Sequence, residues 1–111
     1  MSWYFLCEKH ELPTNSTKSF NIDLEEELLE VLILTQQAEI YAYKNSCPHL
    51  GIPLNWQPDK FLSDDKTHIQ CSTHGALFTF EEGYCVAGPC SGQSLISLSV
   101  EQRNDEIWLQ Y

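Results

Sequence analysis

The sequence predicts an all-β fold, a small antiparallel sandwich or barrel. Short segments rich in β-branched and aromatic residues recur at regular spacing and are separated by turn residues. The one stretch with helical character, residues 24–30, is too short to be assigned as a helix, so we expect a turn there. A chain of 111 residues without a linker or internal repeat indicates a single domain over residues 1–111.

Four strands are expected in the first part of the chain, at residues 3–7, 20–24, 31–35 and 40–43. The first is aromatic and apolar, the second alternates apolar and polar residues, and the third is β-branched and apolar. The fourth returns after a turn at residues 36–38. Residues 11–19 hold Pro, Asn and several Ser and Thr, which indicate a loop.

The second part of the chain is expected to contain further short strands, at residues 67–71, 84–86, 95–100 and 106–111. Apolar residues at 77–80 lead into a turn at 81–83, and Gly88-Pro89 breaks the chain again. In the last strand, Ile107 and Leu109 share one face and Trp108 lies on the other.

Composition and charge exclude several classes of function. The chain is 42% hydrophobic and 20% charged, as in a globular protein, and it lacks an apolar run near 18 residues that would cross a membrane. Its first residues do not form a signal peptide, so we expect a cytoplasmic location. A net charge of −10 argues against nucleic acid and favours partner proteins with basic docking patches.

Two boxes of metal-ligating residues dominate the middle of the chain. They read Cys47-Pro48-His49-Leu50-Gly51 and Cys71-Ser72-Thr73-His74-Gly75. Each box offers one thiolate and one imidazole, so two short loops can close around one metal centre. Tetrahedral zinc accepts such a ligand set. A cluster of two irons between the loops accepts it as well, with both Cys on one iron and both His on the other.

The two boxes closely resemble the ligand loops of the Rieske family, and the resemblance covers nearly the whole chain. It implies a Rieske-like iron–sulfur domain with one [2Fe-2S] cluster per chain, held by Cys47, His49, Cys71 and His74. In that family a third loop with Gly-Pro covers the cluster, and Gly88-Pro89 matches it in position and type.

Neighbouring residues are expected to shield the cluster. Leu50, Ile52 and Pro89 offer an apolar rim that limits water. Gly51 and Gly75 lack a Cβ, which lets backbone N–H groups approach the cluster sulfurs.

The chain departs from the high-potential branch of the family at four positions. That branch ties its two boxes together with a disulfide, but the corresponding residues here are Ile52 and Thr73. It also has Ser and Tyr hydroxyls that donate hydrogen bonds to sulfur, where this chain has Ala76 and Phe78. Fewer donors leave more negative charge on sulfur, so we expect a potential of roughly −150 to 0 mV.

The remaining Cys and His residues are expected to be structural. Cys7, Cys85 and Cys90 are expected to be free, buried thiols, the last two packed under Gly88-Pro89. His10 and His68 are expected to be solvated or hydrogen-bonded rather than ligands.

The resemblance thus implies a soluble Rieske-type ferredoxin, a one-electron carrier between a flavin reductase and a terminal oxygenase or reductase, without bond chemistry of its own. Two alternatives remain: the small subunit of a redox enzyme such as assimilatory nitrite reductase, and a structural zinc module.

Overall fold

The structure is a computed structural model that describes residues 2–37, 39–48, 53–55, 61–71 and 75–111. Its strands form two antiparallel sheets, which confirms the predicted all-β class. The described part of the chain contains one short 3-10 turn, η1 (Lys9–Glu11). No helix among these residues is long and apolar enough to span a membrane.

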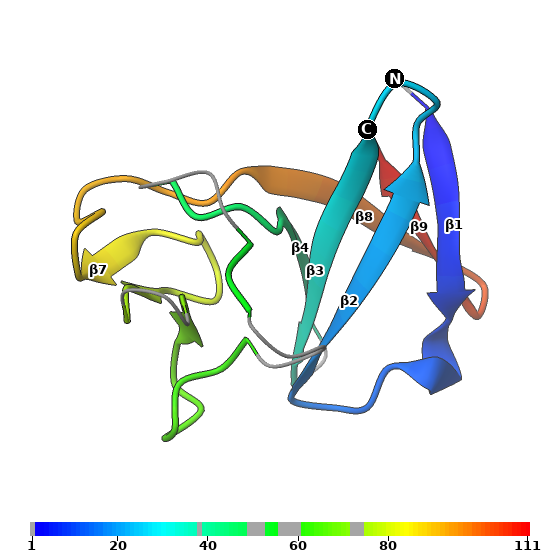
Figure 1. Ribbon diagram of the computed structural model, residues 1–111. Coiled ribbons are helices and arrows are strands. Elements are labelled where there is room, and N and C mark those ends of the chain that lie inside the picture. Colours follow the sequence, from blue (N-terminus) through cyan, green and yellow to red (C-terminus); the bar gives the residue numbers. More distant parts are fainter. Residues whose placement is uncertain (1, 38, 49–52, 56–60, 72–74) are drawn as a thin grey trace.

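The larger sheet has six strands in the order β1-β9-β8-β4-β3-β2. Their bounds are β1 (Trp3–Glu8), β2 (Ser16–Asp23), β3 (Leu28–Gln36), β4 (Glu39–Lys44), β8 (Ser97–Arg103) and β9 (Glu106–Gln110). The sheet curls on itself like a barrel (Figure 1).

The smaller sheet has three strands in the order β5-β6-β7, and it stands beside the larger one (Figure 1). Its strands are β5 (Ile69–Gln70), β6 (Leu77–Phe78) and β7 (Cys85–Ala87). Irregular segments extend both edges, because Leu62 bridges to Ile69 and Ser94 bridges to Tyr84. In the chain, the first predicted ligand box lies between β4 and β5, and the second lies between β5 and β6.

The middle of strand β3, residues 31–34, is buried on both faces, which explains the unbroken apolar run there. Alternate side chains of a strand point to opposite faces. Val31 and Ile33 pack into the core of the larger sheet. Leu32 and Leu34 pack into a second core, which also contains residues of the smaller sheet and of the box roots. One strand therefore joins the two cores.

Two boundaries in the first part of the chain differ from the prediction. Strand β2 begins at Ser16, inside the predicted loop, because the Thr35 hydroxyl accepts a hydrogen bond from the Ser16 N–H at 3.2 Å and donates one to the Pro13 carbonyl. Strand β3 begins at Leu28, inside the predicted turn. The turn closes earlier, because the Leu24 N–H donates to the Glu27 carbonyl at 2.9 Å.

Two strands in the second part are also displaced. The predicted strand at 67–71 is reduced to Ile69–Gln70, because the Asp65 carboxylate accepts hydrogen bonds from the Ser63 and Thr67 hydroxyls, both at 2.7 Å, and folds this segment into a turn. Strand β8 begins at Ser97 instead of residue 95. Leu95 is buried in the second core, and its N–H donates to the Gly83 carbonyl at 2.8 Å.

The two ends of the described chain lie side by side (Figure 1). The Ser2 N–H donates to the Tyr111 carbonyl at 2.9 Å, and the Tyr111 N–H donates to the Ser2 carbonyl at 3.0 Å.

Strand β9 has one buried face and one partly exposed face. Ile107 and Leu109 are fully buried while Trp108 is partly exposed, which matches the predicted faces. The Arg103 guanidinium lies 4.5 Å from the Trp3 ring and 5.4 Å from the Trp108 ring.

Tyr43 connects the two sheets. It lies in β4, its side chain is 1% exposed, and its hydroxyl donates to the Phe80 carbonyl at 2.5 Å, just after β6. A Cβ at Gly83 would lie 2.7 Å from the Tyr43 ring, so the turn that carries Phe80 presses directly on this side chain. Burial raises the pKa of Tyr43 from 10.0 to about 12.

We expect Tyr43→Phe to lower the free energy of unfolding by about 1–3 kcal/mol, because the Phe80 carbonyl loses its donor. Urea unfolding measures the loss, and Tyr84→Phe, which removes a more exposed hydroxyl, is the control. The raised pKa means that Tyr43 stabilises the fold below pH 10 and loses this effect as the pH rises to about 12. The variant should not show this loss of stability between pH 10 and 12. If its stability changed with pH as in the unmodified protein, the proposed contribution of Tyr43 would be contradicted.

Candidate metal centre

The two Cys residues of the predicted ligand set lie in one core. Cys47 follows β4 and Cys71 follows β5, and both are 0% exposed. They belong to the same hydrophobic cluster although 23 residues separate them in the chain. Two fully buried thiols held in one core suit soft metal ions, which thiolates bind strongly.

The other half of the predicted ligand set lies outside the described residues. This holds for His49 and His74, and for the predicted shielding residues Leu50, Gly51 and Ile52. Within the described residues, no group of three or more His, Cys, Asp or Glu side chains could hold a metal ion. The structure therefore shows how the ligand loops are rooted, and the ligand assignment stays a prediction.

Asn45 closes the base of the first ligand loop. It is 7% exposed, and its side-chain carbonyl accepts a hydrogen bond from the Leu54 N–H at 2.8 Å. Its side-chain amide donates to the side-chain oxygen of Asn55 at 2.9 Å, and its backbone N–H donates to the backbone carbonyl of Glu30 in β3 at 2.8 Å. The two ends of the loop that carries Cys47 are thus held together. The sequence analysis missed this residue; its signal is an Asn at the end of a strand and two residues before a predicted ligand.

The two ends of the second ligand loop are joined by backbone hydrogen bonds. The Cys71 N–H donates to the Ala76 carbonyl at 2.9 Å, and the Gly75 N–H donates to the Cys71 carbonyl at 2.8 Å. Gly75 has a φ of +70°, which favours glycine. The Gly75 N–H helps to join the two ends of the loop, and the expected approach of backbone N–H groups to the cluster sulfurs stays a prediction.

The Gly88-Pro89 turn lies against Ala76, and its predicted role as a cover of the cluster stays a prediction. Gly88 has a φ of +100°, and a Cβ there would lie 2.7 Å from the Cα of Ala76. Ala76 directly follows the loop that begins at Cys71. Glycine is therefore required at position 88, for both its conformation and its close approach. Pro89 is exposed, and its expected shielding role stays a prediction.

Ala76 and Phe78 are both 0% exposed, immediately after the second ligand loop. Neither side chain carries a hydroxyl, so neither donates a hydrogen bond to a ligand sulfur. Both side chains share one hydrophobic core with Cys71, and the low potential expected from the sequence stays a prediction.

Two further thiols lie in the same core. Cys85 and Cys90 are 1% and 2% exposed, both are free, and their sulfurs are 2.9 Å apart. Burial, and then the neighbouring Cys85, raise the pKa of the Cys90 thiol to about 12. Charge on Cys47, which lies in the same core, also acts to raise this pKa. Both thiols are free and buried, as predicted.

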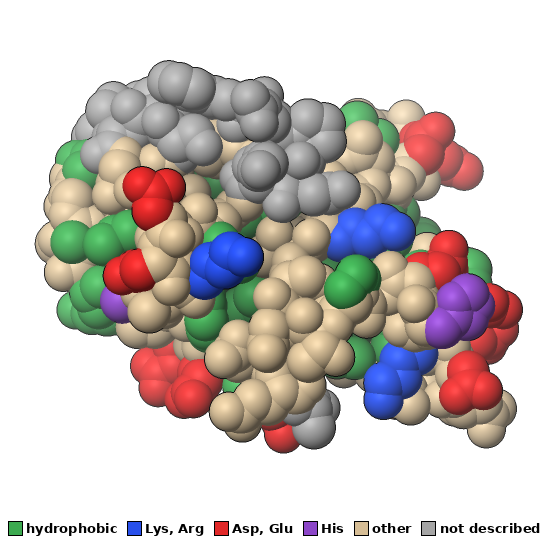
Figure 2. Space-filling model, turned by 90° about the horizontal axis from the view of Figure 1, so that it is seen from below, with side chains coloured by type: hydrophobic (Ala, Val, Ile, Leu, Met, Phe, Trp, Pro, Cys, Tyr) green, Lys and Arg blue, Asp and Glu red, His purple; other side chains and the backbone are tan. Residues whose placement is uncertain are grey.

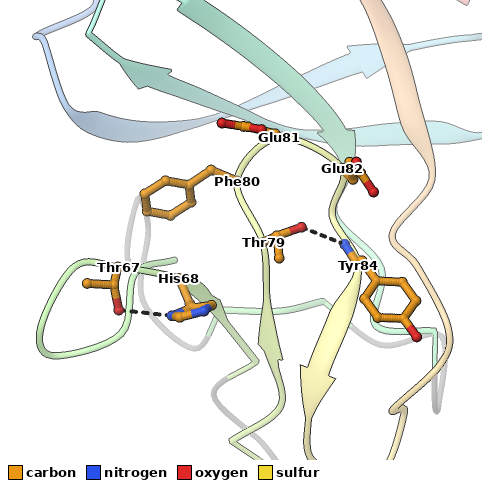
Figure 3. A pocket seen from close by; sticks show the side chains of 7 residues that line it. All are labelled: Thr67, His68, Thr79, Phe80, Glu81, Glu82 and Tyr84. Atoms are coloured by element: carbon orange, nitrogen blue, oxygen red, sulfur yellow. Dashed lines mark hydrogen bonds between the residues drawn. The ribbon is translucent and has the colours of Figure 1, made fainter.

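The two spare His side chains have partners on the surface. The exposed His10 imidazole is 2.5 Å from the Glu8 carboxylate. The His68 ring is 2.9 Å from the Thr67 hydroxyl and lies in an open pocket of about 400 Å³ (Figure 3). The remaining lining residues of this pocket are Thr79, Phe80, Glu81, Glu82 and Tyr84.

The surface is acidic. The chain has 16 Asp and Glu against 6 Lys and Arg. On the face seen in Figure 2, acidic side chains lie on both flanks and few basic ones separate them. The electrostatic field of such a surface attracts a partner with a basic face.

Comparison with protein families matches residues 2–102 to the Rieske [2Fe-2S] domain. Among curated proteins, a cholesterol 7-desaturase of Caenorhabditis elegans is 29% identical over 115 residues. The match covers 98% of this chain but 26% of the desaturase, so the chain spans about a quarter of that relative's length.

Two solved structures illustrate the likeness in fold. The ferredoxin of carbazole 1,9a-dioxygenase from Nocardioides aromaticivorans IC177 superposes with a TM-score of 0.75 at 20% identity, covering 98% of this chain and 97% of that one. The terminal oxygenase of carbazole 1,9a-dioxygenase from Novosphingobium sp. KA1 gives 0.77 at 22% identity, covering 96% of this chain and 29% of that one.

The Asn45 clamp gives a prediction. Asn45→Ala leaves the Leu54 N–H buried without its acceptor, so we expect a loss of about 1–3 kcal/mol in unfolding free energy. Bound metal should also pass to a chelator severalfold faster, because the loop base is loosened. Asn55→Ala keeps the Leu54 hydrogen bond and should lose less. Chemical unfolding measures the loss of stability, and the rate of metal transfer to a chelator measures the loosening of the loop. Asn21→Ala, which removes an exposed side chain, is the control. If Asn45→Ala and Asn21→Ala had equal stability and equal transfer rates, the clamp would be refuted.

Proposed function

Because the chain belongs to the Rieske [2Fe-2S] domain family, we propose that it is a one-electron carrier that passes electrons from a reductase to a terminal oxygenase or reductase. The observation that carries the proposal is the pair of fully buried thiols, Cys47 and Cys71. Each stands at the root of a mixed Cys/His box, and both lie in one core.

Rieske domains bind one [2Fe-2S] cluster, and the residues of this chain fit it. We propose that Cys47 and Cys71 hold one iron and that His49 and His74 hold the other. The thiols meet the requirement for soft donors shielded from water, since both are 0% exposed. When bound, the cluster supplies a one-electron couple with a potential of roughly −150 to +300 mV.

The residues around the thiols set the environment of the centre. The turn at Gly88 rests on Ala76 and leaves no room for a side chain between the two loops. Ala76 and Phe78 fill the core without donating hydrogen bonds, so negative charge stays on the ligand sulfurs. This supports a potential in the lower part of the family's range.

The acidic surface supports the choice of partners. A net charge of −10 favours a reductase and an oxygenase that present Lys and Arg around their docking sites, and speeds their encounter with the carrier. We place the carrier in the cytoplasm as one domain over residues 1–111. We further propose that it performs no bond chemistry itself; the partners of His10 and His68, namely Glu8 and Thr67, support a structural role for these two His.

A second candidate is the electron-delivering module of a larger oxygenase or desaturase. Two observations favour it. The fold superposes on part of a terminal oxygenase with a TM-score of 0.77, beside 0.75 for a free ferredoxin. The sequence also matches about a quarter of a desaturase. Purification from the native source separates the two: a permanently attached catalytic polypeptide would support the module, and a free small protein the carrier.

The ligand assignment predicts the metal content. Anaerobically purified protein should contain about two irons and two acid-labile sulfides per chain and be reddish-brown. His49→Ala and His74→Ala should each lose the cluster, whereas the matched controls His10→Ala and His68→Ala should keep it. Iron and sulfide analysis with electron paramagnetic resonance measures this. One zinc per chain without iron would overturn the assignment.

The carrier function predicts salt-dependent kinetics. Electron transfer to the correct partner should slow severalfold as salt rises to roughly 0.5 M, because the Debye length falls below ~5 Å and the acidic surface is screened. Stopped-flow reduction across a salt series measures this. A rate that does not change with salt would show that the acidic surface does not steer the encounter.

A further inference from the structure

Two Cys residues that the proposed function does not use lie close together beside the metal centre. Cys85 is in β7, Cys90 follows the Gly88-Pro89 turn, and their sulfurs are 2.9 Å apart. A disulfide bond measures about 2.05 Å, so little movement separates the two thiols from a bond. Both side chains lie in the core that contains Cys47 and Cys71.

The backbone holds the two thiols in this arrangement. The Cys85 N–H donates to the Gln93 carbonyl at 2.8 Å, and the Gln93 N–H donates to the Cys90 carbonyl at 2.9 Å. Gln93 thus bridges the two Cys residues through the backbone. The hairpin therefore holds the backbones of the two Cys residues close together.

We propose that Cys85 and Cys90 form a reversible disulfide, a two-electron site beside the one-electron centre. The oxidant is a low-molecular-weight disulfide. Once a local opening exposes it to water, Cys90 loses its proton, attacks this disulfide as a thiolate and forms a mixed disulfide, which releases one small thiol. Cys85 then displaces the second small thiol and closes the protein disulfide. Two protein thiols are oxidised, one small disulfide is reduced to two thiols, and these carry the two protons.

The turn between the two residues gives the oxidant a route to the buried sulfur. Of residues 88–94, all of which the structure describes, Cys90 is the one that is buried. Gly88 and Gly92 have φ angles of +100° and +91°. Because the rest of this segment is already exposed, a local opening exposes Cys90 and leaves β3 and β4 in place.

The disulfide would restrict the motion of the Gly88-Pro89 turn, which is proposed to cover the metal centre. Gly88 rests on Ala76 beside the second ligand loop, and the ring closed by Cys85 and Cys90 contains this turn. The bond therefore restricts the opening of the turn. We expect iron to pass to a chelator severalfold more slowly from the oxidised form. This step rests on the proposed cluster, whereas the disulfide itself does not.

The test uses holoprotein equilibrated without oxygen in mixtures of reduced and oxidised glutathione. After acid quenching and alkylation, intact mass should show two fewer free thiols in the oxidising mixtures and all five in the reducing ones. Peptide mapping should join Cys85 to Cys90. Cys7→Ser is the matched control, since Cys7 is buried in β1, and it should still lose two thiols. Cys85→Ala and Cys90→Ala should not.

Five free thiols at every glutathione ratio would overturn the proposal, and so would a bridge that persists in Cys85→Ala or maps to Cys47 or Cys71. Visible absorption recorded in the same samples reports whether the cluster is intact. A protein without iron that still forms the Cys85–Cys90 bridge would contradict the proposed function and leave this inference standing.

Discussion

The structure depends on one strand, β3, whose middle residues are buried on both faces. Leu32 and Leu34 of β3 pack into the core beneath the ligand loops, and Val31 and Ile33 pack into the core of the curled sheet. Burial of these side chains stabilises both cores at once, at about 1.5–3 kcal/mol for each Val, Leu or Ile. The smaller sheet, with strands of two or three residues, is too small to stand alone and is stable because β3 and Tyr43 supply part of its core.

The polar contacts around the centre have a different role. Asn45 ties the first ligand loop to Leu54 and to β3, and the backbone of Cys71 ties the second loop to Ala76. The apolar core brings the two loop roots together, but it cannot set the conformation of a loop. Directional hydrogen bonds and the two glycines at 75 and 88 do so, because each fixes a backbone shape that packing alone leaves open.

Much of this could be predicted from the sequence, and the exceptions share a cause. The apolar run of β3 and the alternation of Ile107, Trp108 and Leu109 are local patterns, so they indicated strands correctly. The ligand types and spacing of the two boxes predicted a metal centre, and its four ligands stay a prediction. The start of β2 at Ser16 and the clamp at Asn45 depend on partners distant in sequence, Thr35 and Leu54, whose approach is decided by the tertiary fold. A local pattern can mark Asn45 as a residue of interest, but it does not identify these partners.

The antiparallel pairing of Ser2 with Tyr111 has a consequence for how this fold is used. Because the chain enters and leaves at one place, a polypeptide can be spliced on at both ends while the metal centre stays undisturbed. The fold can serve as an insertable cassette. The same fold covers 97% of a small ferredoxin and 29% of an oxygenase. A gene fusion at either end would therefore leave the residues of both cores unchanged.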